Sequence, residues 1–132
     1  MPIIPAAERI PYLQPFLEQC HLRQYPSRAA IVHAGDASDS LFFIVKGSVS
    51  VVIEDSEGRE MVVAYLNAGD FFGEMGLFEE KPVRSAWIRA KTACEIAEIS
   101  YRKFKDIARQ DAGLMFALSA QLAGRLRATT RK

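Results

Sequence analysis

The sequence predicts a mainly β domain, a barrel or jelly roll, with helices at both ends. Roughly six to eight short segments rich in β-branched and aromatic residues occupy the middle of the chain, separated by Gly and Asp turns at near-regular spacing. Helical patterns flank this block. The 132 residues are 49% hydrophobic and 25% charged, which suits a globular chain with one core. We therefore expect a single domain over 1–132, with a helical segment at 1–20, strands over 21–100 and helices over 101–132.

Each predicted strand is bounded by a turn. Residues 40–46 are β-branched and aromatic and end at Gly47. Residues 48–54 alternate between apolar and polar side chains, as expected for a half-buried strand. The polar turn at 55–58 leads into 60–66, which predicts a hairpin. The other predicted strands are residues 21–25, 30–33, 86–90 and 95–99.

Three helices are predicted outside the strand block. Residues 12–20 place their apolar side chains on one face of a short helix. Ser100 is a suitable N-cap for a second helix at 101–109. The longest runs from about 112 to Lys132. No Gly, Asn or Pro closes its pattern, so we expect it to continue beyond Lys132 in a longer parent protein.

The long helix carries a stripe typical of a coiled-coil seam. The spacing of three and four residues alternates along Phe116, Ser119, Ala123, Leu126 and Thr130, with Leu122 beside this stripe. Ser119 and Ala123 are small enough for helices to approach closely. The stripe covers barely two heptads, so packing against the domain itself explains it equally well. The residues of this predicted seam are Phe116, Ser119, Leu122, Ala123 and Leu126.

One loop near the middle of the chain has the parts of a phosphate site. Gly73 and Gly76 allow tight turns and close approach of the backbone to a ligand. Residues 77–80 can form a helical turn whose free N–H groups would face an anion. Arg84 offers a planar, permanently charged fork suited to phosphate oxygens, and Ser85 adds a hydroxyl donor.

Glu74 does not fit a site for phosphate alone. Its carboxylate would repel an anion, so it must serve another part of the ligand. A hydrogen bond accepted from a sugar hydroxyl is the obvious role, although Glu74 could instead cap the turn. A phosphate and a sugar held together indicate a nucleotide.

Composition and residue counts argue against several other functions. A formal net charge of +1 gives no general argument for nucleic-acid or membrane binding. There is no secretory signal and no apolar run of about 20 residues, so we expect a cytoplasmic protein with no membrane partner. His21 and His33 are the only histidines, too few for a metalloenzyme of the cupin type. We expect no enzyme, no catalytic residues and no metal site.

Sensors that hold a prosthetic group are a further alternative. Cys20 and Cys94 cannot hold an iron–sulfur cluster that needs four thiolates. A haem sensor stays open, because one histidine can be an axial ligand. No other cofactor is expected.

Four segments resemble the cyclic-nucleotide-binding domain. They are residues 44–49, 65–67, 69–71 and the long run 84–95. More narrowly, the chain from about residue 21 to Lys132 is similar to the N-terminal half of the bacterial cyclic-AMP receptor, or catabolite activator, family. The resemblance implies a β-roll followed by a long helix that forms a homodimer.

The resemblance also implies roles for individual residues. Arg84 and Ser85 would bind the exocyclic phosphate of cyclic AMP. Glu74 would accept from the ribose 2′-hydroxyl, with the Gly73 backbone nearby. Other matching positions would line the pocket with apolar side chains. These positions are Val32, Val51, Val63 and Met75.

Two threonines near the end of the long helix complete the implied site. Thr129 would contact the adenine from its own subunit, and Thr130 would reach the ligand of the partner subunit. Bacterial members usually carry serine at the second position, so Thr130 keeps the hydroxyl and adds a methyl group. The implied function is a cyclic-AMP sensor of a transcription activator. DNA and RNA polymerase would be partners only through a full-length parent, since no DNA-reading domain lies within these residues. Kinase regulatory subunits and ion channels use the same domain and remain alternatives.

Overall fold

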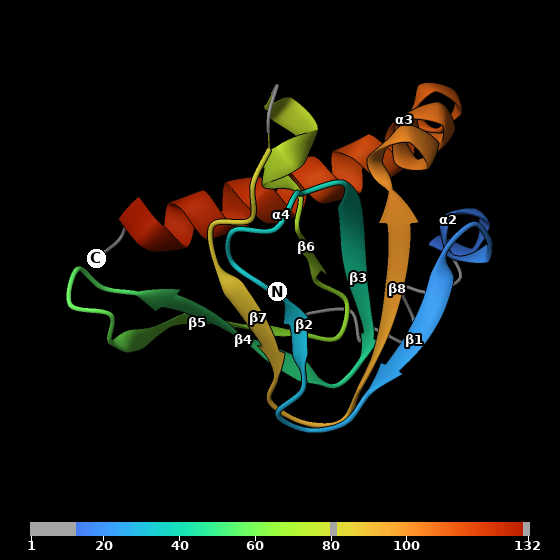
Figure 1. Ribbon diagram of the computed structural model, residues 1–132. Coiled ribbons are helices and arrows are strands. Elements are labelled where there is room, and N and C mark those ends of the chain that lie inside the picture. The colour runs from blue at the N-terminus through green and yellow to red at the C-terminus, as the bar shows by residue number, and fades with distance from the viewer. Residues whose placement is uncertain (1–12, 80–81, 131–132) are drawn as a thin grey trace.

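The computed structural model describes residues 13–79 and 82–130 and shows two antiparallel sheets with flanking helices (Figure 1). Each sheet has four strands, in the orders β1-β8-β3-β6 and β2-β7-β4-β5. The predicted mainly β fold class, a β-roll or jelly roll, is confirmed. The strands are β1 (His21–Tyr25), β2 (Ala30–Val32), β3 (Ser40–Lys46), β4 (Ser48–Glu54), β5 (Glu60–Asn67), β6 (Phe71–Phe72), β7 (Trp87–Ala90) and β8 (Cys94–Ser100).

Strand β3 divides the core into two parts because it is buried on both faces. Its odd-numbered side chains, Leu41 and Phe43, pack against the helices. Its even-numbered neighbours, Phe42 and Ile44, pack between the two sheets. This alternation follows from the two-residue period of a strand, and it explains why the segment reads as a nearly continuous apolar run.

The β4–β5 hairpin contains an irregularity that affects the site. Val51 pairs with Ala64, whereas the next residue of β4, Val52, pairs with Val62. Strand β5 therefore carries Val63 as an extra residue between two consecutive pairs. Such a bulge reverses the alternation of side chains on either side of it.

The helices lie where the sequence predicts them, but the residues at which they begin and end differ from the prediction. They are α2 (Gln14–Glu18), α3 (Tyr101–Gln110) and α4 (Ala112–Thr130). Helix α2 is shorter than residues 12–20; Pro15 stands in its first turn, where its missing N–H costs no hydrogen bond. The cap of α3 is confirmed, because the Ser100 hydroxyl accepts from the Lys103 amide at 3.2 Å.

Helix α4 crosses the molecule behind β6 and carries its C-terminal end away from α3 (Figure 1). It is anchored by buried Leu114 and Leu118 and by the polar side chains of Gln121 and Arg125. The Gln121 side-chain amide donates to the Gly69 carbonyl at 2.7 Å and accepts from the Phe71 amide at 2.8 Å. Gln121 thus bonds to the backbone around β6 much as a neighbouring strand would.

The predicted seam of α4 lies mainly on the outer surface of the helix. Phe116 is 77% exposed and Leu126 is 66% exposed. Ser119 and Ala123 are exposed as well, and only Leu122 packs partly against the core. Within the described residues, no helix is both long enough and apolar enough to span a membrane.

Candidate ligand-binding site

The loop after β6 brings the backbone close to Arg84. Gly73 has a φ of +80°, a conformation that residues with a side chain rarely adopt. A Cβ at this position would lie 2.7 Å from Nη1 of Arg84 and 3.0 Å from the Phe42 ring. The first glycine of the loop is thus required both by the turn and by the close packing beneath the guanidinium group.

Arg84 is held from two directions. Its backbone N–H donates to Asp36 and its carbonyl accepts from Gly35, which fixes the segment before β7 against the β2–β3 loop. Its side chain donates from Nη2 to the Ser40 carbonyl at 2.8 Å and from Nη1 to the Gly73 carbonyl at 3.2 Å. These bonds orient a half-buried guanidinium group whose remaining N–H groups are available at the cavity that it lines.

Glu74 lies on the other side of the same loop and contacts α4. Its carboxylate is 3.5 Å from Nη1 of Arg125, and the Glu74 side chain is only 13% exposed. Arg125 also donates to the Phe71 carbonyl and, at 3.4 Å, to Gln121. The ion pair links the ligand loop to the long helix, and Arg125 lines the same cavity.

Arg125 was missed by the sequence analysis. The available signal was its position four residues before Thr129, which places the two residues on one face of the helix. The side chains of Thr129 and Thr130 lie outside the part of the chain that is described.

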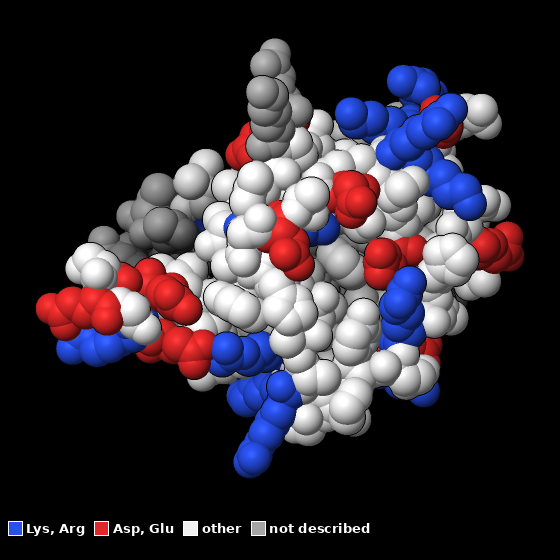
Figure 2. All heavy atoms as spheres, viewed as in Figure 1, with Lys and Arg blue, Asp and Glu red and all other residues white. Residues whose placement is uncertain are grey.

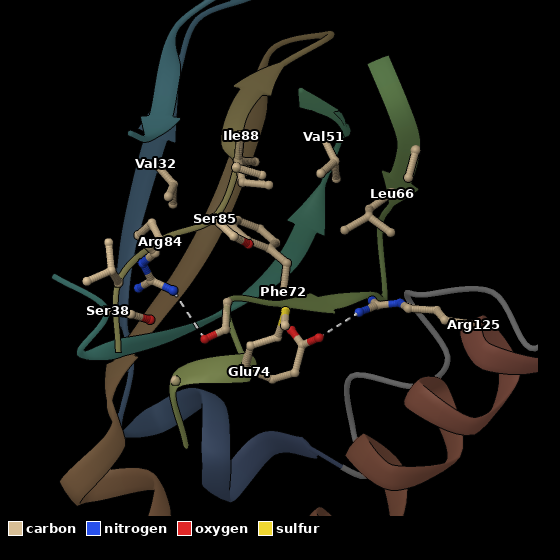
Figure 3. A pocket seen from close by; sticks show the side chains of 16 residues that line it. Val32, Ser38, Val51, Leu66, Phe72, Glu74, Arg84, Ser85, Ile88 and Arg125 are labelled. Carbon is tan, nitrogen blue, oxygen red and sulfur yellow. Dashed lines mark hydrogen bonds and ion pairs between the residues drawn. The ribbon is translucent and has the colours of Figure 1, made fainter. Parts of the chain in front are cut away.

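These residues surround one cavity of about 220 Å³ between the second sheet, the loop and α4 (Figure 3). Arg84 and Ser85 approach from the segment before β7, whereas Glu74 and Arg125 lie toward α4. Apolar side chains form the remaining walls. Such a mixture of apolar walls and a few convergent polar groups is typical of a small-molecule site. The apolar lining is Val32, Val51, Ala64, Leu66, Phe72, Met75, Val83, Ala86 and Ile88.

On the face that Figure 2 shows, most charged side chains lie at opposite ends of the molecule. Figure 2 shows Asp and Glu gathered over the β4–β5 hairpin at the left and Lys and Arg gathered over α3 at the upper right, with mostly uncharged residues between them. The charges that matter for a ligand are therefore the few that line the cavity itself.

Three of the four apolar positions expected in the lining are there, and Val63 is not. The bulge in β5 is the reason: Ala64 pairs with Val51 and takes the place at the cavity, while Val63 is 48% exposed. The predicted helical turn also differs. It is a 3-10 turn, η2 (Met75–Phe78), and so begins two residues earlier than residue 77. Residue 80 lies outside the described residues.

The β-roll thus holds an arginine and a carboxylate at one mostly apolar cavity, an arrangement suited to a small ligand. Residues 22–111 match the family model described as "Cyclic nucleotide-binding domain". The chain belongs to this family. The resemblance noted in the sequence is thereby confirmed.

Similar proteins include transcription regulators from several bacteria. The chain is 52% identical over 127 residues to the cAMP-activated global transcriptional regulator Vfr of Pseudomonas aeruginosa, covering 94% of this chain and 59% of Vfr. It is 53% identical over 122 residues to the cAMP-activated global transcriptional regulator CRP of Escherichia coli O6:H1, covering 92% of this chain and 58% of CRP. The chain thus spans less than two thirds of the length of these regulators.

A solved structure shows the same fold. The regulator CLP of Xanthomonas campestris, described as c-di-GMP responsive, superposes with a TM-score of 0.83 at 39% sequence identity. The match covers 90% of this chain and 60% of CLP. The names of these relatives are those of transcription regulators and not of enzymes.

Proposed function

We propose that this chain is the cyclic-AMP-sensing domain of a dimeric bacterial transcription activator. The observation that carries the proposal is the placement of Arg84 and Glu74 at one apolar cavity. The proposal is supported by sequence identities of 52% and 53% to regulators that are named cAMP-activated. In this proposal DNA and RNA polymerase are engaged by the longer parent protein.

The cavity matches the three chemical parts of cyclic AMP. Arg84 and Ser85 bind the exocyclic phosphate, since a guanidinium fork and a hydroxyl are suited to its oxygens. Glu74 accepts a hydrogen bond from the ribose 2′-hydroxyl, with the Gly73 backbone beside it. The adenine lies along the apolar walls toward α4, where Thr129 and the partner subunit's Thr130 contact it.

Ligand binding would then act directly on the long helix. The Glu74–Arg125 ion pair joins the ribose end of the cavity to α4. A nucleotide that contacts Glu74 competes with this pair or reorganises it, and a nucleotide that contacts Thr129 adds a new bond to the same helix. Such differential contacts are what an allosteric ligand requires. In the parent protein, the resulting shift of α4 repositions the DNA-binding domains.

Cyclic di-GMP is the rival ligand, because CLP is described as responsive to it. It carries two phosphates and two guanine bases and so needs more room than cyclic AMP. Titration of the chain with each nucleotide separates the two proposals. Tight binding of cyclic di-GMP without binding of cyclic AMP would favour cyclic di-GMP as the ligand.

The ribose contact predicts a specific ligand preference. We expect 2′-deoxy cyclic AMP to bind roughly 10-fold or more weakly than cyclic AMP, because a hydrogen bond to a charged acceptor is worth about 1.5–3 kcal/mol. In Glu74→Gln the difference between the two ligands should shrink. Isothermal titration calorimetry of both ligands on both chains measures it.

A matched control is Glu79→Gln, which removes a carboxylate from an exposed residue in the same stretch. It should leave the preference for cyclic AMP unchanged. Equal binding of the two ligands by the unsubstituted chain would remove Glu74 from the ribose role while leaving cyclic AMP binding itself intact. Absence of cyclic AMP binding would overturn the proposed function.

The exposed seam of α4 predicts a homodimer. In this dimer Phe116, Ala123 and Leu126 face the same residues of the other subunit across a two-fold axis. Ala123→Glu would therefore bring two carboxylates together in an interface without water. We expect the substituted chain to sediment as a monomer at concentrations where the parent is dimeric, and we expect cyclic AMP to favour the parent dimer.

Ala128→Glu is the control for this experiment. Ala128 is exposed on the same helix, and the 100° rotation per residue places it well away from the seam. It should leave the mass unchanged. A dimer that survives Ala123→Glu would place the interface elsewhere, and a strictly monomeric parent with and without nucleotide would contradict dimerisation of this chain.

A further inference from the structure

Tyr101 is a buried residue whose hydroxyl reaches the ligand loop from α3. It is the first residue of that helix, and its side chain is 9% exposed. The hydroxyl donates to the Gly73 carbonyl and lies 2.6 Å from the Ser38 hydroxyl, which is also buried. Three segments distant in sequence therefore meet at one phenol oxygen: the β2–β3 loop, the loop after β6, and α3.

The direction of these hydrogen bonds follows from the donors available. A carbonyl oxygen can only accept, so the single phenol proton of Tyr101 goes to Gly73. The Ser38 hydroxyl must then donate its proton to the Tyr101 oxygen. Ser38 thus donates to Tyr101, and Tyr101 donates to the Gly73 carbonyl. Consecutive hydrogen bonds of this kind polarise and strengthen one another.

The Gly73 carbonyl at the end of this chain also accepts from Arg84. Nη1 of Arg84 lies 3.2 Å from it, while Nη2 is held by Ser40. One carbonyl oxygen, with two lone pairs, is thus shared between the phenol and the guanidinium group. The position of the Gly73 carbonyl therefore sets the orientation of the Arg84 guanidinium group at the cavity.

The second glycine of the loop shows how closely this arrangement is packed. A Cβ on Gly76 would lie 2.6 Å from the hydroxyl oxygens of both Ser38 and Tyr101. Each glycine of the loop thus leaves room for a neighbouring group. Gly73 packs against the Arg84 guanidinium group, and Gly76 packs against the hydroxyls of Ser38 and Tyr101. The pattern Gly-Glu-x-Gly is accounted for by these two close contacts.

We propose that Tyr101 is a positioning residue of the phosphate site, which holds the Gly73 carbonyl and through it the guanidinium group of Arg84. This inference rests on the proposed function, because it takes Arg84 as the group that binds phosphate. It gives the hydroxyl of Tyr101 a role separate from the packing of its ring, and it makes α3 a support of the ligand site.

Tyr101→Phe tests the inference, because it keeps the ring and removes only the hydroxyl. Calorimetric titration of the 132-residue chain should show cyclic AMP affinity reduced about 3- to 10-fold, the range expected for one hydrogen bond. In an Arg84→Lys background the same change should have little further effect, because an ammonium group has no fork to be oriented. Tyr25→Phe is the matched control; Tyr25 is not among the residues that line the cavity, and affinity should be unchanged.

A second measurement needs no nucleotide. The ¹H–¹⁵N resonance of Arg84 Nε reports the order of the guanidinium group, and it should shift or broaden in Tyr101→Phe but not in Tyr25→Phe. Ser38→Ala, which removes the donor to the phenol, should move the same resonance by less. This variant also serves if Tyr101→Phe does not fold.

Two results would overturn the positioning role. One is an unchanged Arg84 resonance with unchanged affinity in Tyr101→Phe. The other is an equal loss of affinity from Tyr101→Phe in the unsubstituted chain and in the Arg84→Lys background, which would indicate a purely structural effect. If the unsubstituted chain does not bind cyclic AMP, the proposed function fails, whereas the resonance of Arg84 still decides whether Tyr101 positions it.

Discussion

Arg84→Ala should weaken the binding of cyclic AMP by roughly 10-fold to several hundred-fold, because a charged donor to phosphate is worth about 1.5–3 kcal/mol and more when its partner is left buried. Arg84→Lys should recover only part of the loss, since a single ammonium group cannot replace the two-pronged contact. Isothermal titration calorimetry gives both affinities directly.

The same substitution should also lower stability. Arg84 donates to the carbonyls of Ser40 and Gly73, and both lose their guanidinium partner in the alanine variant, although Gly73 still accepts from the Tyr101 hydroxyl. A buried acceptor without a partner costs about 1–3 kcal/mol, which thermal denaturation can detect. Arg109→Ala is the control, because Arg109 forms an exposed ion pair with Asp106. An affinity for cyclic AMP that is unchanged in Arg84→Ala would place the phosphate elsewhere.

Gly73→Ala should damage both folding and binding. A residue with a Cβ at a φ of +80° is strained by about 1–2 kcal/mol. The new methyl group would also lie 2.7 Å from Nη1 of Arg84, which is the end of a flexible side chain. The guanidinium group should therefore move, and we expect cyclic AMP affinity to fall at least about 10-fold because the fork leaves its productive position.

Gly58→Ala separates the two effects. Gly58 has nearly the same backbone angle, with a φ of +79°, but a Cβ there would meet nothing within 4 Å. Both variants should lose similar stability from backbone strain, and only Gly73→Ala should lose affinity. Chemical denaturation and calorimetry on the pair provide the comparison. Equal affinities in the two variants would show that contact between Gly73 and Arg84 does not matter for the ligand.

Much of the fold could be predicted because its signals are local. Alternating side chains identified the hairpin of β4 and β5, and Ser100 identified the start of α3. Strand β6 was not predicted, since two residues carry no periodicity. Val63 was assigned to the cavity from the resemblance, and the bulge that excludes it depends on how two strands pair rather than on either strand alone.

The candidate site could be predicted only in part. Gly73, Glu74, Arg84 and Ser85 stand close together in sequence, so their combined chemistry was visible as a motif. Arg125 and Tyr101 belong to helices that reach the loop only in the folded chain. The spacing of four residues from Thr129 was the one local signal for Arg125, and Tyr101 has no local feature that marks it as part of such a site.

The bonding of Gln121 to the backbone beside β6 limits how α4 can move. A turn of the helix about its own axis would carry the amide away from the Gly69 carbonyl and the Phe71 amide, breaking two hydrogen bonds together. Leu114 and Leu118 resist the same rotation from the core. We therefore expect a displacement of α4 to be felt at β6 and at the loop that follows it, since Gln121 bonds to the backbone on both sides of Asp70. If the loop binds the proposed nucleotide, the two hydrogen bonds of Gln121 would connect that loop to the long helix, in addition to the Glu74–Arg125 ion pair.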